Sequence, residues 1–256
     1  MENLTKTNNI LVENKEKEKV IITGKILKRT TIVMAIVTAL FIISMSITIP
    51  ILWRGFYYNQ IDMLGVVSDS GYSREQIIKA YDEMMDFCTG KTDKFATGIL
   101  PYSESGKEHF ADVKKLFIFD MFVAVCTSIT LIVVCGQIFV FKKKIVSRIK
   151  GKSFLFWGSC TVFGVFAFLT VAVGLFFDKA FLIFHKLFFP GKTNWTFDWD
   201  EDQIIRILPE DYFRNCAILI IVFSMILCMT FVTIDNISNT EKRVSRKQKK
   251  NKKVTA

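Results

Sequence analysis

The chain has 256 residues, of which 51% are hydrophobic and 14% aromatic, and its formal net charge is +10. A soluble domain this apolar would expose large adhesive patches, whereas a bilayer accommodates apolar side chains and confines charges to the loops. Composition therefore argues against a soluble protein and favours an integral membrane protein.

Four apolar runs are long enough to cross about 30 Å of hydrocarbon, which takes roughly 20 helical residues. Only one of them contains a charge, at Asp120. The first run is too long for a signal peptide and follows a polar segment, so we expect it to remain as an anchor. The predicted transmembrane helices are residues 30–53, 116–141, 154–177 and 215–234.

The distribution of Lys and Arg predicts the orientation, because positively charged segments stay on the cytoplasmic side. Three segments are strongly basic and are predicted to be cytoplasmic: 1–29, 142–153 and 235–256. Two are slightly acidic and are predicted to form an extracellular cap in two parts: 54–115 and 178–214. The predicted fold is therefore an all-α integral membrane protein with four spans and an outer cap. The basic tail is interpreted as contacting anionic lipid, not nucleic acid.

The first cap segment contains a predicted amphipathic helix. Ser73 and Gln76 fit a capping box, and the apolar positions that follow fall on one face at helical spacing. That face includes Ile77, Tyr81 and Met84. It suits either the membrane surface or packing against the rest of the cap, and the sequence leaves both open.

The only two histidines, His109 and His185, each lie just outside a predicted outer membrane boundary. His109 is predicted on a helix that continues into the second span, where Asp112 shares its face. His185 lies in an aromatic segment that we expect to fold onto the first cap segment. Imidazole exchanges protons near neutral pH, although two polar interfacial residues would also explain the pattern. The sequence contains no Cys/His metal spacing, nucleotide loop or nucleophile elbow, so no metal or cofactor is expected.

Two blocks of sequence carry a family resemblance. The first, SESGKEHFADVK, begins at Ser103, and the second comprises FHKLFFPGKTNWTFD and DQIIRILPEDYF. Together with the four spans, they resemble small bacterial membrane proteins of the lipoprotein intramolecular transacylase family. The chain departs from the family pattern at Gly106, where many members carry an acid, and at Trp199, where proline is common.

The resemblance implies an acyl transfer within one substrate at the outer face of the bacterial cytoplasmic membrane. The family moves the sn-2 acyl chain of a diacylglyceryl lipoprotein to the α-amino group of its N-terminal cysteine, without a cofactor. By this resemblance His109 and His185 are the catalytic residues. The expected supporting or substrate-binding residues are Ser103, Glu108, Asp112, Lys114, Phe184, Phe188, Trp195, Phe197, Asp198 and Asp202.

Two other functions remain open from the sequence. A membrane lipid or peptide hydrolase would use the same histidines but release its product with water. A sensor or assembly protein would retain its function after both histidines were replaced. The sequence predicts no particular oligomeric state, lipoprotein substrate or acyl-chain preference.

Overall fold

The computed structural model describes residues 2–141 and 145–254, and the named secondary-structure elements in these residues are all helices. The start of the predicted basic loop, residues 142–144, lies outside the described residues, as do Met1 and residues 255–256. In chain order the helices are α1 (Glu2–Leu52), α2 (Arg54–Met63), α3 (Val66–Ser70), α4 (Arg74–Cys88), α5 (Glu104–Phe139), α6 (Phe154–Leu175), α7 (Phe177–Phe188), the 3₁₀ helix η1 (Gln203–Ile207) and α8 (Glu210–Val254).

Four of these helices are long and apolar enough to cross a membrane, which confirms the predicted number of spans. Their candidate spanning ranges are Val20–Leu52, Glu104–Phe139, Phe154–Leu175 and Glu210–Thr240. A helix of 36 residues, such as α5, is about 54 Å long at 1.5 Å per residue, so it extends well beyond the hydrocarbon. The predicted segment boundaries remain a prediction, because helix ends do not mark the edges of a bilayer.

The chain divides into two compact units. The terminal unit comprises Met1–Leu40, Thr127–Thr161 and Cys228–Ala256. The cap unit comprises Phe41–Cys126 and Val162–Leu227. Both histidines and both predicted cap segments fall in the cap unit.

In the terminal unit, α6 approaches α1 closely at Gly158. A Cβ at this position would lie 2.6 Å from Thr38 Cβ and 2.7 Å from the Ala35 carbonyl oxygen, so no larger residue fits without displacing α1. One turn of α1 earlier along the chain, the Thr31 hydroxyl donates to the Ser147 carbonyl at 2.9 Å. Close backbone packing and the hydrogen bonds between Thr31 and Ser147 thus join α1 to the segments around it.

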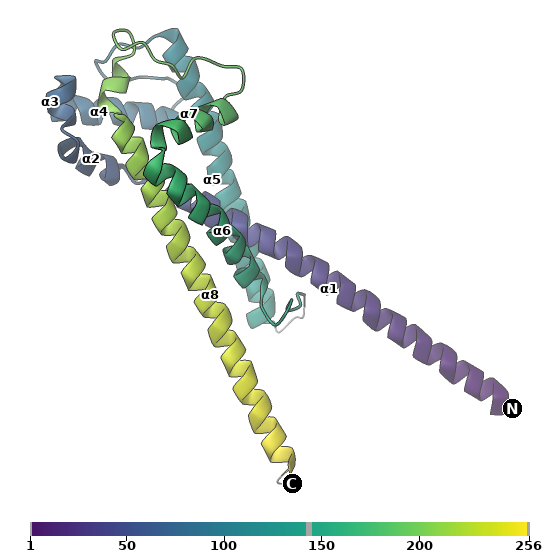
Figure 1. Cartoon of the computed structure of the whole chain (residues 1–256). Helices are drawn as coiled ribbons and strands as arrows, with labels where there is room; N and C mark the ends of the chain where they lie inside the picture. Colours follow the sequence, from purple (N-terminus) through teal and green to yellow (C-terminus); the bar gives the residue numbers. More distant parts are fainter. Residues whose placement is uncertain (1, 142–144, 255–256) are drawn as a thin grey trace. The chain divides into compact units, whose positions relative to one another are not determined.

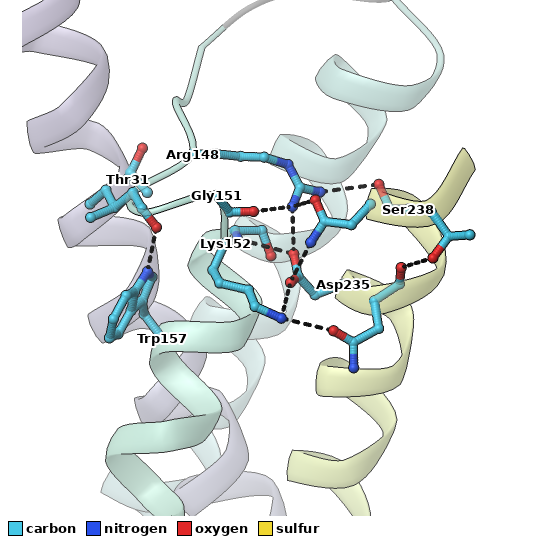
Figure 2. Close-up of polar contacts among 12 residues, drawn as sticks. Thr31, Arg148, Gly151, Lys152, Trp157, Asp235 and Ser238 are labelled. Atoms are coloured by element: carbon cyan, nitrogen blue, oxygen red, sulfur yellow. Dashed lines mark hydrogen bonds and ion pairs between the residues drawn. The ribbon is translucent and has the colours of Figure 1, made fainter. Parts of the chain in front are cut away.

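A buried carboxylate organises the loop before α6 in the same unit (Figure 2). The side chain of Asp235 on α8 is fully buried, and Arg148 Nη1 lies 3.0 Å from its Oδ1. Lys152 Nζ lies 3.7 Å from Oδ2, and the Ser153 amide donates to Oδ1 at 3.0 Å. A buried charge must be paired to be tolerated, and here two cations and an amide compensate it.

In the cap unit, α4 packs into the protein core. Ser73 and Gln76 form the predicted capping box, with reciprocal bonds between side chain and backbone. Its apolar face is buried, including Ile77, Tyr81 and Met84. The sequence left open whether this face contacts the membrane surface or the rest of the cap, and the structure shows that it packs within the cap. Figure 1 shows the short helices α2, α3 and α4 gathered together, and α4 contacts both α2 and η1.

The second cap segment folds onto the first, as predicted. The hydroxyl of Tyr57 donates to the Ile207 carbonyl at 2.6 Å, and the hydroxyls of Tyr81 and Tyr212 lie 3.1 Å apart. Tyr57 and Tyr81 also stack, with ring centroids 3.7 Å apart. Aromatic residues with a polar tip can be fully buried when each hydroxyl finds a partner, which is the arrangement here.

Asp120, the one charged residue in a predicted span, has a hydrogen-bond partner on another helix of the cap unit. The Thr48 hydroxyl on α1 donates to Asp120 Oδ2 at 2.9 Å. This bond connects α1 and α5 and compensates part of the cost of placing a carboxyl group among apolar side chains.

Candidate active site

The first turn of α5 is held by Asp202, which precedes η1. The Ser103 amide and hydroxyl donate to Asp202 Oδ1 at 2.8 Å and 2.9 Å, and the Gly106 amide donates to Ser103 Oγ at 2.9 Å. Ser103 therefore caps α5, while the buried carboxylate of Asp202 lies at the positive end of the helix. A Cβ on Gly106 would overlap Asp202 Oδ1, so glycine is required where the resemblance leads one to expect an acid.

One turn further along α5 lies His109. Its side chain is only 5% exposed, and its Nδ1 atom is buried with no hydrogen-bond partner. Rings of Phe189 and Phe197 pack edge-on against the imidazole, with centroids 4.9 Å and 5.3 Å away. A buried polar atom without a partner is costly in a folded protein, and a catalytic role is one explanation for such an atom.

His185 lies in the last turn of α7 and is 8% exposed. Its Nδ1 atom lies 2.8 Å from the Phe181 carbonyl oxygen, which can only accept a hydrogen bond. Nδ1 therefore carries the hydrogen, and Nε2 of the neutral ring carries a lone pair. Burial lowers the pKa of the His185 imidazole, against the opposing effect of the Phe181 carbonyl, so the ring is neutral at pH 7.

The two imidazole rings face each other inside the cap unit. Their centroids are 6.0 Å apart and their planes differ by 29°. Phe189 contacts both rings, with centroids 4.9 Å from His109 and 5.8 Å from His185. The ring of Trp195 packs against His185, with the two centroids 5.1 Å apart. Side chains from α5, α7 and the loop after α7 thus form one cluster of aromatic rings around the two imidazoles, which we call the aromatic chamber.

Some of the predicted aromatic residues line this chamber and others lie at its edge. Trp195 and Phe197 each contact one imidazole, and Phe184 lies 5.4 Å from His185. Phe188 packs on Phe184 at 4.7 Å and is half exposed. Phe188 therefore extends the aromatic cluster outward from the histidines.

Asp112 joins the helix of His109 to the loop that follows His185. Its carboxylate pairs with Lys192, accepts a hydrogen bond from Lys115 at 3.0 Å and a longer one from Asn194 at 3.3 Å. Lys192 and Asn194 lie three residues and one residue before Trp195. Asp112, which shares a helix face with His109, therefore bonds to these residues, and the contacts position the loop that carries Trp195.

Three other predicted site residues lie away from the imidazoles. Glu108 is exposed, and Asp198 is exposed in a turn where it accepts the amides of Asp200 and Glu201. Lys114 lies over the ring of Phe87 and donates to Asp93 at 3.0 Å. Lys114 thus stabilises the first cap segment rather than the histidine pair.

The sequence did not single out Phe189, whose ring contacts both histidines. Phe189 is buried and follows His185 by four residues, so helical spacing would have placed it on the face of the imidazole. Lys192 was also missed, because its partner lies in the other cap segment. Among the described residues, no group of three or more His, Cys, Asp and Glu side chains is arranged to hold a metal ion.

Comparisons with known proteins point to one family. The family model for Lipoprotein intramolecular transacylase Lit matches residues 32–213. A solved structure of the membrane integral lipoprotein intramolecular transacylase Lit from Bacillus cereus shares 27% identity, with a TM-score of 0.75, over 84% of this chain and 96% of that chain. A second structure of the Bacillus cereus protein, with a histidine replaced by arginine, gives 26% identity and a TM-score of 0.74 over 90% and 99%. Curated protein sequences show no significant match.

Proposed function

The chain belongs to the lipoprotein intramolecular transacylase family, and on that basis we propose that it performs this acyl transfer on diacylglyceryl lipoproteins. The sn-2 acyl chain moves from the glyceryl group to the α-amino group of the same N-terminal cysteine. The product is a lyso-form, N-acylated lipoprotein. The observation that supports this proposal is the buried pair of imidazole rings, 6.0 Å apart, in an aromatic chamber.

The tautomer of His185 suggests how the two histidines divide the work. With Nδ1–H bonded to Phe181, the Nε2 lone pair of His185 is available to take the proton of the attacking amine. The N–C bond forms, the ester C–O bond breaks, and the same proton passes from His185 to the departing glyceryl oxygen. The reaction therefore balances without water, metal or cofactor.

We assign His109 the role of stabilising the oxygen of the tetrahedral intermediate. Its ring lies across the chamber from His185, and its buried Nδ1 lacks a protein partner. A neutral imidazole can donate one hydrogen bond to a developing oxyanion, and this bond is strong in a site that excludes water. Asp202, Ser103 and Asp112 act as positioning residues, because they hold the helix and loop that carry the chamber.

Positioning contributes more than proton transfer in this proposal. General acid–base catalysis supplies about 10²- to 10⁴-fold, equal to roughly 3 to 5 kcal/mol. Holding amine and ester in reactive geometry can supply about 7 to 11 kcal/mol. The substrate carries both the amine and the ester on one flexible headgroup. An aromatic chamber that holds this headgroup folded therefore removes most of the entropic cost of bringing the two groups together.

Charge bias supports the orientation that we propose. Segments 1–29, 142–153 and 235–256 carry the excess of Lys and Arg, which supports cytoplasmic chain ends and a cap on the outer face of the cytoplasmic membrane. Basic segments beside spans attract anionic headgroups with about 1 kcal/mol per charge near the surface. Anionic lipid is therefore the expected partner on the cytoplasmic side.

The experiment is expression in a bacterial host that makes diacylglyceryl lipoproteins and lacks this enzyme activity. Acyl migration conserves mass, so the N-terminal lipopeptides are fragmented by mass spectrometry to locate the acyl chain. The native chain should yield N-acylated lyso-lipopeptides, and His109→Ala and His185→Ala should not. Ser105→Ala, an exposed change on the same helix as His109, is the control and should retain activity.

The other outcomes distinguish the alternatives. Release of free fatty acid without N-acylation would identify a hydrolase. An unacylated amine with the native chain would refute the transacylase. Full activity of both histidine variants would refute the site assignment and leave the reaction intact.

A further inference from the structure

One side of α7 exposes large apolar side chains. Ile183, Phe184, Leu187 and Phe188 are 62%, 46%, 69% and 47% exposed. Their spacing places them along one side of the helix. A soluble surface rarely exposes a contiguous stripe of this kind, and such a stripe marks contact with another molecule or with lipid.

The other sides of α7 have different characters. His185 and Phe189 are buried against the chamber, four residues apart. Lys179 and Lys186 are exposed and, seven residues apart, share a third side. A helix with an apolar side and flanking lysines is typical of interfacial helices, whose lysine stems reach the headgroups while the apolar side enters the acyl region.

The connection to α6 places this stripe at the membrane surface. The candidate span in α6 ends at Leu175, and α7 begins at Phe177, so a single residue separates them. Leu175 and Phe176 are also largely exposed, so apolar surface continues from the span into α7. Aromatic residues are enriched at this depth of a membrane.

We propose that the apolar side of α7 is immersed in the lipid leaflet next to the cap, and that the lipid ester reaches His185 from that side. This inference rests on the proposed function for its substrate and goes beyond it in assigning the entry route. The occupant of the exposed stripe is the acyl region of the bilayer.

A continuous row of aromatic rings connects the stripe to the imidazole. Phe188 packs on Phe184 at 4.7 Å, and Phe184 lies 5.4 Å from His185. A glyceryl ester can follow this row while its acyl chains remain among other lipid chains. The enzyme then avoids extracting two acyl chains into water, which would expose a large apolar area. Phe184 and Phe188 thus serve substrate entry, beside the chamber itself.

Photo-crosslinking in the full chain tests the immersion. A diazirine amino acid is placed at Leu187 or, as the matched control, at the neighbouring Lys186, and the protein is irradiated in vesicles of phosphatidylethanolamine and phosphatidylglycerol. Peptide mass spectrometry should find acyl-chain adducts at position 187 and mainly water adducts at 186. Water adducts at 187, or a covalent dimer of two copies through 187, would overturn the inference. Position 183 provides a second site with the same expectation.

A charge placed on the stripe tests the entry route. Leu187→Glu should lower acyl migration in vesicles at least tenfold, Leu187→Phe should retain it, and Lys186→Gln should change it less than twofold. Native activity of Leu187→Glu would overturn the entry route. If the native chain transfers no acyl group but crosslinks lipid at 187, the proposed function fails while the immersion of α7 stands.

Discussion

Gly106 on α5 and Asp202 before η1 lie so close that a Cβ on the glycine would overlap the carboxylate. The same carboxylate accepts hydrogen bonds from both the amide and the hydroxyl of Ser103, which caps α5 nearly two turns before His109. A contact between the two cap segments therefore determines where the first histidine is held.

Replacing Gly106 with alanine should displace Asp202 and weaken the cap of α5. We expect a loss of about 1 to 3 kcal/mol in stability, from overpacking together with the lost cap, and at least a tenfold loss of acyl migration. Thermal unfolding in detergent and lipopeptide mass spectrometry measure the two effects. Gly136→Ala is the control, because nothing lies within 4 Å of its added Cβ on the same helix. Equal behaviour of the two variants would contradict the role of Asp202.

The protonation state of His185 is directly measurable, because the chain contains only two histidines. In the His109→Gln variant, ¹⁵N-histidine NMR should show the Nδ1–H tautomer and a titration midpoint below the ordinary value of about 6.5. The pKa is lowered by burial, so the ring stays neutral at pH 7 and takes up a proton only as the pH falls below 6.5. A midpoint above 6.5 would contradict the proposed base.

The lowered pKa of His185 also predicts that the cap unit loses stability at acidic pH. The unfolded state binds a proton to His185 near pH 6.5 and the folded state only at lower pH, so folding is favoured above 6.5 and weakened as the pH falls below it. His185→Gln should reduce this acid dependence. Thermal midpoints between pH 5 and pH 8 measure the effect, and an unchanged slope in the variant would contradict it.

Asp112→Asn should lower acyl migration through the loop that carries Trp195. The substitution removes the charge that pairs with Lys192, at a cost on the order of 1 to 2 kcal/mol, reduced because Lys192 is half exposed and screened by solvent. We expect kcat to fall more than KM rises, because the chamber wall is displaced. Asp93→Asn removes the exposed ion pair of Lys114 and should change activity less than twofold. Comparable losses in the two variants would show that Asp112 has no special role.

Asp235→Ala should destabilise the terminal unit. It leaves Arg148 and Lys152 without their buried partner, and breaking such a pair costs about 3 to 5 kcal/mol, at the lower end here because both cations are partly exposed. Thermal unfolding should shift down strongly, while Asn236→Ala, which removes only an exposed bond to Lys152, should shift little. A stability equal to that of the native chain would contradict the pairing.

The sequence alone determined the membrane class, the four spans and the capping box at Ser73. These features depend on apolar run length, charge and local spacing, which adjacent residues encode. It also singled out His109 and His185, because histidine is rare in the chain and both lie beside spans.

The tertiary structure alone decided which residues complete the site. Asp112 pairs with Lys192, Asp202 occupies the space beside Gly106, and Phe189 contacts both imidazoles. It also decided that the apolar face of α4 packs into the cap, although the same pattern suits a membrane surface. These contacts join segments far apart in the chain. A hydrophobic periodicity indicates which face of a helix is buried but not which residues cover it.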